Sequence, residues 1–304
     1  GKFRRQRQMC IRDRLKSLEA EYHSILELSK FDISKESLSD IKFADNASYV
    51  LHGASIASPT FYRQFPVETI DANIWGLRSL LEFYKKNRQL EGLLFFSSSE
   101  IYGDPSSECI PTDEEYRGYV SCHGPRACYD ESKRFGETIC WVYSKQFSMP
   151  ITVVRPFNNF GPGMATTDKR LPADFARHVL NNEDLNIYSD GSPTRTFCYI
   201  SDAIVGYLLS LTHGRYDFFN IGMDRPEISV KEFAFMFQNI GKEVLNYRGK
   251  IHFGESKDPD YMTDNPNRRC PNISKAKDKL GYDPTVLVEE GVERYLKFLV
   301  ESKS

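Results

Sequence analysis

A tyrosine and a lysine spaced four residues apart carry the clearest chemical signal in this 304-residue chain. Tyr129 and Lys133 lie in a segment with helical periodicity, so their side chains share one helix face. An ammonium beside a phenol favours the phenolate, and we therefore expect Lys133 to lower the pKa of Tyr129 from its usual value of about 10. The pair predicts a general base that removes a proton from a hydroxyl group. The alternative is two unrelated side chains on a solvated helix face.

Hydroxyls and one carboxylate precede this pair. Ser98, Ser99 and Glu100 follow an apolar run at residues 93–96 that predicts a buried strand. Asn158 follows a second such run, at residues 151–155. Ligands of parallel sheets bind beyond the carboxyl ends of the strands, so these four residues are candidates for a binding or catalytic site. Alternatively, Glu100 is an ordinary charge at a strand end and Asn158 caps a turn.

The elements that must position these residues alternate between strand and helix. Apolar runs predict strands at residues 25–33, 49–52, 93–96 and 151–155, and helical periodicity predicts helices at residues 15–23, 73–86 and 129–146. Phe95, Phe96 and Trp141 are expected in the core. The alternation predicts an α/β fold with a Rossmann-like, doubly wound parallel sheet. Beyond residue 161 the pattern loosens, which predicts a smaller substrate lobe over the active edge of the sheet.

Composition excludes several classes of protein. With 40% hydrophobic residues, 27% charged residues and a formal net charge of −2, the chain has no general attraction for nucleic acid or anionic membranes. No apolar run approaches the length of about 18 residues that spans a bilayer. The seven cysteines have no metal-ligand spacing. They predict reduced thiols in a cytoplasmic protein without a metal site.

The N-terminal region lacks an expected element. Glycine is absent from residues 2–52, so the glycine-rich turn that places a dinucleotide's pyrophosphate at a helix N-terminus is missing. Residues 1–14 are basic and have no strand or turn pattern, and we expect a non-native or disordered arm. The expected domains are this arm, a truncated dinucleotide-binding unit at residues 15–160 with roughly 195–222, and a substrate lobe at 161–194 and 223–304.

Several motifs together resemble the extended short-chain dehydrogenase/reductase family, and within it the NAD-dependent nucleotide-sugar epimerases, dehydratases and decarboxylases. The resemblance spans roughly residues 15–300. Besides Tyr129 and Lys133, it is carried by residues 51–59, 69–73, 98–103, 155–162 and 190–197. Residues 99–105 and 124–131 are most similar to the branch that decarboxylates UDP-glucuronate.

The resemblance implies a mechanism. Tyr129 would take the proton of the sugar 4-hydroxyl while a hydride passes from C4 to NAD⁺, with Ser98 hydrogen-bonded to the same hydroxyl. Lys133 would stabilise the phenolate and hold the nicotinamide ribose. The resulting β-keto acid would lose CO₂, with Ser99 and Glu100 assisting at C5.

Arg195 would steer the carboxylate, because a guanidinium fork suits a planar carboxylate; alternatively it binds the diphosphate. The product would be UDP-xylose or the 4-keto pentose. Serine at position 99 cannot act as the acid that the 4,6-dehydratases supply with an aspartate. A 4-epimerase, a 4,6-dehydratase and an inactive truncated relative remain alternatives.

Further roles follow only from the resemblance. It implies NAD contacts by Asp32, Ala54, Ser55, Ala57, Thr69 and Asn73 with Tyr129 and Lys133, and nucleotide-sugar contacts by Asn158, Arg170, Tyr188, Arg195 and Arg269. Asp32 could instead serve a turn, Thr69 and Asn73 a polar helix face, and Arg170, Tyr188 and Arg269 an ordinary surface or packing role. The resemblance also implies a homodimer through a four-helix bundle of residues 73–86 and 129–146, with no nucleic-acid or membrane partner.

Overall fold

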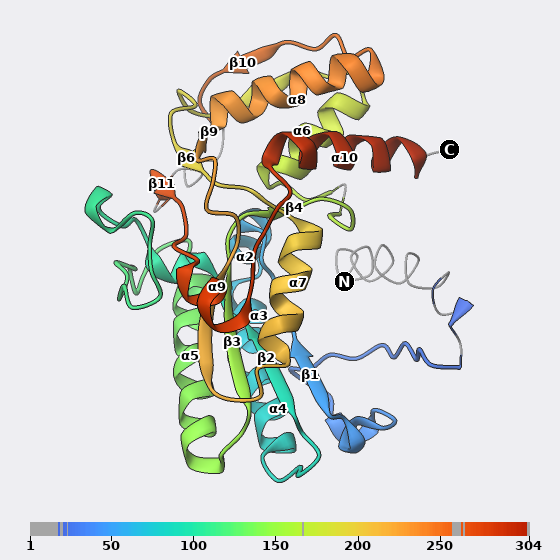
Figure 1. Ribbon diagram of the computed structural model, residues 1–304, viewed down its shortest axis with the longest axis vertical. Coiled ribbons are helices and arrows are strands. Elements are labelled where there is room, and N and C mark those ends of the chain that lie inside the picture. The colour runs from blue at the N-terminus through green and yellow to red at the C-terminus, as the bar shows by residue number, and fades with distance from the viewer. Residues whose placement is uncertain are drawn as a thin grey trace.

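The computed structural model describes Leu18, Glu21, Tyr22, Thr263 and residues 24–165, 167–256 and 265–302. The arm expected at residues 1–14 and most of the helix expected at 15–23 lie outside these residues. Figure 1 shows a sheet-containing unit with a second, mainly helical lobe packed against one end of it.

The centre of the first unit is a parallel four-stranded sheet. Its strands are β1 (Tyr49–His52), β2 (Gly92–Phe96), β3 (Ile151–Pro156) and β8 (Asp217–Ile221), in the order β1-β2-β3-β8. All three pairings are parallel. Strands β2 and β3 are buried along nearly their whole length, as expected for apolar runs covered on both faces. The predicted α/β fold with a parallel sheet is confirmed.

Helices cover both faces of this sheet. Helices α4 (Leu77–Tyr84) and α5 (Ala127–Phe147) pack on the face that carries Leu93 and Phe95. Helices α7 (Ile200–Leu211) and α9 (Ser274–Leu280) pack on the opposite face, which carries Leu94. Because side chains alternate along a strand, one continuous apolar run supplies both cores.

The second lobe is built round α6 (Leu171–Leu180), α8 (Val230–Leu245) and α10 (Val288–Glu301), which enclose a core rich in phenylalanine. The short strands form three small sheets: β4 (Asn159–Phe160) with β7 (Cys198–Tyr199), β5 (Leu185–Ile187) with β10 (Ile251–Phe253), and β6 (Thr194–Arg195) between β9 (Ile228–Ser229) and β11 (Arg268–Arg269). The remaining elements are η1 (Leu38–Asp40), η2 (Ala44–Asn46), α2 (Pro59–Gln64), α3 (Pro66–Ile70), the π-helical η3 (Asp71–Gly76), η4 (Ser99–Tyr102) and η5 (Ser107–Cys109).

The prediction of a strand at residues 25–33 is wrong. Residues 26–32 form no regular element, and a turn follows at 33–35. The carboxylate of Asp32 accepts hydrogen bonds from the backbone N–H and the hydroxyl of Ser34, at 3.2 and 2.6 Å. This local bonding favours a turn over a strand. Within the described residues, β1 is consequently an edge strand.

The other predicted elements agree with the structure, with two adjustments. The helix expected at residues 73–86 is divided into a π-helical turn, η3, and the α-helix α4. Phe95 is fully buried as predicted, but Trp141 is 49% exposed, so its assignment to the core is wrong. Trp141 lies on the side of α5 that faces away from the sheet.

Two general features bear on the class of protein. None of the helices in the described part of the chain is both long and apolar enough to cross a membrane. The six cysteines within that part are free thiols.

The contact between α5 and β2 provides a test of the packing. A Cβ placed on Gly136 would lie 2.5 Å from Cζ of Phe95, deep in the interface between helix and sheet. We expect Gly136→Ala to lower the free energy of unfolding by about 1–3 kcal/mol through overpacking, despite the better helix propensity of alanine. Urea denaturation measures this. Gly254→Ala is the control, because no atom lies within 4 Å of its added Cβ; equal stabilities for the two variants would contradict the packing.

Candidate active site

The candidate site lies where β2 ends and α5 begins. Ser97 and Ser98 follow β2, and the 3₁₀ turn η4 then carries Ser99 and Glu100. The hydroxyl of Ser98 accepts a hydrogen bond of 3.2 Å from the backbone N–H of Glu100 and so caps this turn. The cap fixes the direction of the chain and places Ser98 beside the first turns of α5.

Tyr129 and Lys133 lie together on the buried face of α5. Their exposed fractions are 6% and 2%, which excludes a solvated helix face. The ammonium Nζ of Lys133 donates a 2.7 Å hydrogen bond to the backbone oxygen of Phe96 and lies 5.6 Å from the centre of the Tyr129 ring. A hydrogen bond joins Tyr129 to Ser98. The structure therefore brings the predicted serine, tyrosine and lysine together.

The predicted lowering of the tyrosine pKa is wrong for this structure. Burial raises the pKa of Tyr129 to about 12, although the hydrogen bond with Ser98 lowers it. Burial also lowers the pKa of Lys133 to about 7. Removal from water penalises both charged forms, and the lysine thereby loses much of the charge that was expected to favour the phenolate.

A second tyrosine holds the first in place. The ring of Tyr62, from α2, stacks on the ring of Tyr129 with centroids 5.0 Å apart and planes inclined by 12°. Tyr62 is 1% exposed. The sequence analysis missed this residue, because no spacing relates α2 to α5 and only the fold brings them into contact.

The carboxylate of Glu100 is bound by two arginines. Arg126, immediately before α5, donates to one oxygen, and Arg269, from β11, donates to the other. Burial opposes ionisation of Glu100, but the charges of Arg126 and Arg269 outweigh it and lower its pKa to about 2. Glu100 is therefore a fixed anion at neutral pH and not a proton donor.

Asp130 completes this charge cluster. Its Oδ2 lies 3.3 Å from Nε of Arg126, and both side chains are largely buried. Burial, reinforced by the charge of Glu100, raises the pKa of Asp130 to about 7. Arg126 and Asp130 received no role from the sequence. Their spacing of four residues beside Tyr129 was the available signal, because it places all three on adjoining parts of one helix face.

Arg195 lies next to Arg269, since β6 and β11 pair with Arg195 opposite Arg269. Its guanidinium donates to the backbone oxygens of Pro266 and Asn267, at 2.6 and 3.1 Å. Burial and the charge of Arg269 lower the pKa of Arg195 to about 10. Two arginines from adjacent strands therefore adjoin the same carboxylate, which favours an anionic ligand at this place.

The remaining substrate candidates occupy three loops. Asn158 has a left-handed backbone, with φ of 42°, and donates a 2.9 Å hydrogen bond to the oxygen of Thr196. Arg170 forms a 2.6 Å ion pair with Asp168, and its positive charge partly offsets the rise in the pKa of Tyr129. Tyr188 follows β5 in the second lobe and is 39% exposed. Their contacts with a nucleotide sugar remain predictions.

The cofactor candidates fall into two groups. Ala54, Ser55 and Ala57 lie in the loop that follows β1, and the hydroxyl of Ser55 is buried with no hydrogen-bond partner among the described residues. Thr69 and Asn73 are fully buried and serve the packing of helices, because Thr69 donates to the oxygen of Phe65 and Asn73 to the hydroxyl of Ser132. The exposed polar face considered for them is excluded.

These residues fit one end of a dinucleotide better than the other. The small side chains after β1, the unpaired hydroxyl of Ser55 and the buried Lys133 suit a nicotinamide and its ribose. Asp32 accepts hydrogen bonds within its own turn, and residues 26–31 before it form no strand. The described residues contain no glycine-rich turn for the pyrophosphate.

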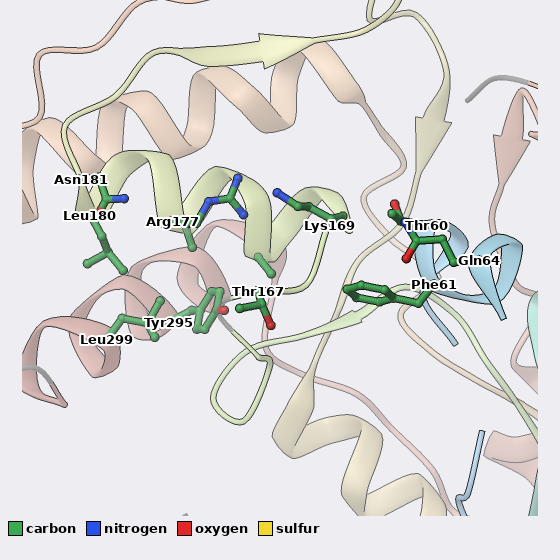
Figure 2. Close-up of a pocket in the computed structure, with 12 residues that line it drawn as sticks. Thr60, Phe61, Gln64, Thr167, Lys169, Arg177, Leu180, Asn181, Tyr295 and Leu299 are labelled. Carbon is green, nitrogen blue, oxygen red and sulfur yellow. The ribbon is translucent and has the colours of Figure 1, made fainter. Parts of the chain in front are cut away.

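A cavity of about 650 Å³ lies between α2, α6 and α10. Figure 2 shows Phe61 and Gln64 of α2 on one side of it, with side chains of α6 and α10 on the other. Thr167 and Lys169 also line it and flank Asp168, the partner of Arg170. The cavity thus adjoins the loop that carries a predicted substrate contact.

Known proteins are similar to this chain both in sequence and in fold. The model of the NAD dependent epimerase/dehydratase family matches residues 4–222. UDP-glucuronic acid decarboxylase 1 of Xenopus tropicalis is 38% identical over 249 residues, which cover 82% of this chain and 56% of that protein. UDP-glucuronic acid decarboxylase 3 of Arabidopsis thaliana is 36% identical, covering 89% of this chain and 73% of that protein. The chain thus spans little more than half of the first of these relatives.

Among solved structures, UDP-glucuronic acid 4-epimerase of Bacillus cereus, in complex with UDP-glucuronic acid and NAD, superposes with a TM-score of 0.75. It is 25% identical and covers 96% of this chain and 86% of its own. UDP-glucose 4-epimerase of Thermotoga maritima superposes with a TM-score of 0.76 at 24% identity, covering 89% and 84%. At this identity, the second superposition shows similarity of fold alone.

The lowered pKa of Lys133 predicts how stability depends on pH. Folding lowers this pKa from 10.5 to about 7, so the unfolded chain binds the extra proton between these values. The buried ammonium therefore opposes folding below about pH 7, and this penalty is lost as the pH rises toward 10. We expect Lys133→Met to gain stability relative to the parent at pH 6.5, by about 1 kcal/mol or more, and to lose that advantage near pH 9.5.

Urea denaturation at the two pH values measures this difference. Lys145→Met, which removes an exposed lysine of the same helix, is the matched control and should show no such trend. A stability difference for Lys133→Met that is independent of pH would contradict the assignment.

Proposed function

Since the chain belongs to the NAD dependent epimerase/dehydratase family, we propose that it is an NAD-dependent nucleotide-sugar enzyme that decarboxylates UDP-glucuronate through a 4-keto intermediate. The observation that carries the proposal is the arrangement round Glu100. A buried tyrosine and two arginines from the strands β6 and β11 adjoin one fixed carboxylate, and a buried lysine lies beside the tyrosine. The names of the relatives at 36–38% identity support decarboxylation over other reactions.

The first step of the proposed reaction is oxidation at C4 of the sugar. Tyr129, oriented by Tyr62 and Ser98, takes the proton of the sugar 4-hydroxyl. Lys133 and the loop after β1 would hold NAD⁺, which would supply the acceptor for the hydride from C4. Because the pKa of Tyr129 is about 12 in this structure, its side chain is a phenol near neutral pH and must lose its own proton before it can accept the proton of the 4-hydroxyl.

Two arginines bind the carboxylate of the sugar in this proposal. Nη2 of Arg269 is buried without a hydrogen-bond partner in the described part of the chain, so it can donate to the C5 carboxylate. Arg195 stands beside it on the paired strand. Once C4 is a ketone, the carboxylate is β to a carbonyl and leaves as CO₂, with Ser99 and the ionised Glu100 at C5. Loss of CO₂ leaves an enolate that takes a proton at C5, which gives the 4-keto pentose. The reduced cofactor would return the hydride to C4 to give UDP-xylose.

An inactive relative is the second candidate. Two observations favour it: glycine is absent from residues 2–52, and β1 is an edge strand of the described sheet. Both fall in the part of the fold that is expected to bind the pyrophosphate of NAD. The two candidates differ in whether NAD binds.

Replacing the proposed base tests the reaction. We expect Tyr129→Phe to lower the rate of CO₂ release from UDP-glucuronate, with NAD supplied, by about 100- to 10,000-fold, because the phenyl ring keeps the stack on Tyr62 but cannot accept a proton. Product analysis by NMR measures the rate. Tyr119→Phe is the control, because Tyr119 is 87% exposed.

Other products identify the alternatives. A 4-epimer formed without CO₂ would establish a 4-epimerase, and a 4-keto-6-deoxy sugar formed from a UDP-hexose would establish a 4,6-dehydratase. Absence of turnover, together with absence of heat when NAD is titrated in a calorimeter, would favour the inactive relative.

We further propose a homodimer formed through η3, α4 and α5. Trp75, Phe135 and Trp141 are 51%, 52% and 49% exposed on these elements, and such large apolar side chains are depleted from ordinary surfaces. Burying them against a second copy would remove this apolar area from water.

Light scattering tests the dimer. We expect a mass of twice the 35.1 kDa chain, and we expect Trp141→Glu to shift it toward the monomer because the variant places a charge in the interface. Phe253→Glu is the control, since Phe253 is exposed in the second lobe. A monomeric parent protein would refute the dimer.

A further inference from the structure

The charge cluster round Glu100 contains two residues to which the proposed reaction gives no part. Arg126 and Asp130 lie one helical turn apart where α5 begins, with 7% and 8% of their side chains exposed. A buried arginine and aspartate are costly unless their charges are paired. Their function in the fold therefore needs an explanation beyond a surface ion pair.

Arg126 divides its guanidinium between two acids. Nε points to Asp130, at 3.3 Å, and Nη2 points to Glu100. The guanidinium is planar, so two acids bound through different nitrogens, Nε and Nη2, determine both its position and its orientation. Asp130 thus holds Arg126, and Arg126 in turn holds one oxygen of Glu100. The other oxygen of Glu100 is held by Arg269, from the opposite side of the site.

The cluster differs from a purely structural ion pair elsewhere in the same unit. Arg155 binds both oxygens of Glu137, at 2.9 and 2.6 Å, and also the hydroxyl of Tyr102, so this network is closed. In the cluster round Glu100, by contrast, Oδ1 of Asp130 and Nη2 of Arg269 are both buried without a hydrogen-bond partner among the described residues. Open hydrogen-bonding capacity at a buried cluster is typical of a functional site.

We propose that Arg126, held by Asp130, is a positioning residue that fixes the carboxylate of Glu100 toward the reacting end of the substrate. The proposal rests on the proposed function, because it gives Glu100 a place in the reaction. Arg269 can then turn toward the substrate carboxylate, which its unpaired Nη2 binds, while Arg126 retains Glu100. Without Arg126, a single guanidinium would have to hold both carboxylates.

Charge and geometry can be separated with two substitutions of Arg126. Arg126→Lys keeps the positive charge but replaces the planar fork with a single ammonium, which cannot retain both acids in the same geometry. Arg126→Gln removes the charge as well. Asp130→Asn keeps the shape of the side chain but weakens the hold on Arg126.

The first measurement concerns the enzyme in turnover of UDP-glucuronate with NAD. We expect Arg126→Lys and Arg126→Gln each to lower kcat by about 10- to 100-fold with KM changed less than about threefold, because a displaced group costs rate and not binding. Asp130→Asn should cause a smaller loss in kcat. Lys145→Gln is the control, because Lys145 is an exposed cation near the other end of the same helix; it should retain the parental kcat.

The second measurement does not require turnover. The carboxyl carbon of Glu100, assigned with Glu100→Gln in protein labelled with ¹³C at glutamate, reports its pKa by NMR. We expect that pKa to stay low in Arg126→Lys and in Lys145→Gln, and to rise by at least about one unit in Arg126→Gln, where a main stabilising charge is lost.

The two measurements separate failure of this inference from failure of the proposed function. If the parent chain releases no CO₂, the proposed function fails, and an unchanged Glu100 pKa in Arg126→Gln would still overturn the positioning role. If the parent is active, full kcat in Arg126→Lys would overturn the positioning role even though the reaction stands. Should Arg126→Gln fail to fold, Arg126→Lys carries the kinetic test.

Discussion

The binding of one carboxylate by arginines from opposite lobes is the constraint on which this site depends. Glu100 follows the sheet, Arg126 begins α5, and Arg269 belongs to a short strand of the second lobe. Because an unpaired buried carboxylate is strongly disfavoured, the two lobes are held in the relation that supplies both guanidiniums. The same interaction places the arginine pair of β6 and β11 over the end of β2, where the hydroxyls and the tyrosine lie.

Most of the titratable side chains of the candidate site come from the start of helix α5 and the residue before it. They are Arg126, Tyr129, Asp130 and Lys133, and Gly136 allows the helix to approach Phe95 closely enough to bury them. Burial then sets their ionisation. It raises the pKa of the tyrosine and lowers that of the lysine, so both charged forms are disfavoured in this state. Arginines beside such a site suit an anionic ligand, and a tyrosine buried in this way must lose its own proton before it can act as a base.

The exposed apolar residues and the edge of β1 show where the described unit is not closed. Trp75, Phe135 and Trp141 lie on the helices that cover one face, while Tyr49 and Leu51 lie half-exposed on the edge strand. Apolar area on helices suits association with another folded surface, whereas an edge strand also presents unpaired backbone groups. The two surfaces therefore have different chemistry, and the first suits a second copy of the chain.

Much of the fold could be read from local pattern. The strands at 49–52, 93–96 and 151–155 and the helix at 129–146 were predictable, because continuous apolar runs and a 3.6-residue period are strong local signals; so was the shared face of Tyr129 and Lys133. The strand at 25–33 was not, because its apolar run competes with the Asp32 turn and has no partner beside β1. Tyr62, Arg126 and the directions of the pKa shifts depend on contacts between segments distant in sequence and on exclusion of water. Those arise from packing, which periodicity does not encode.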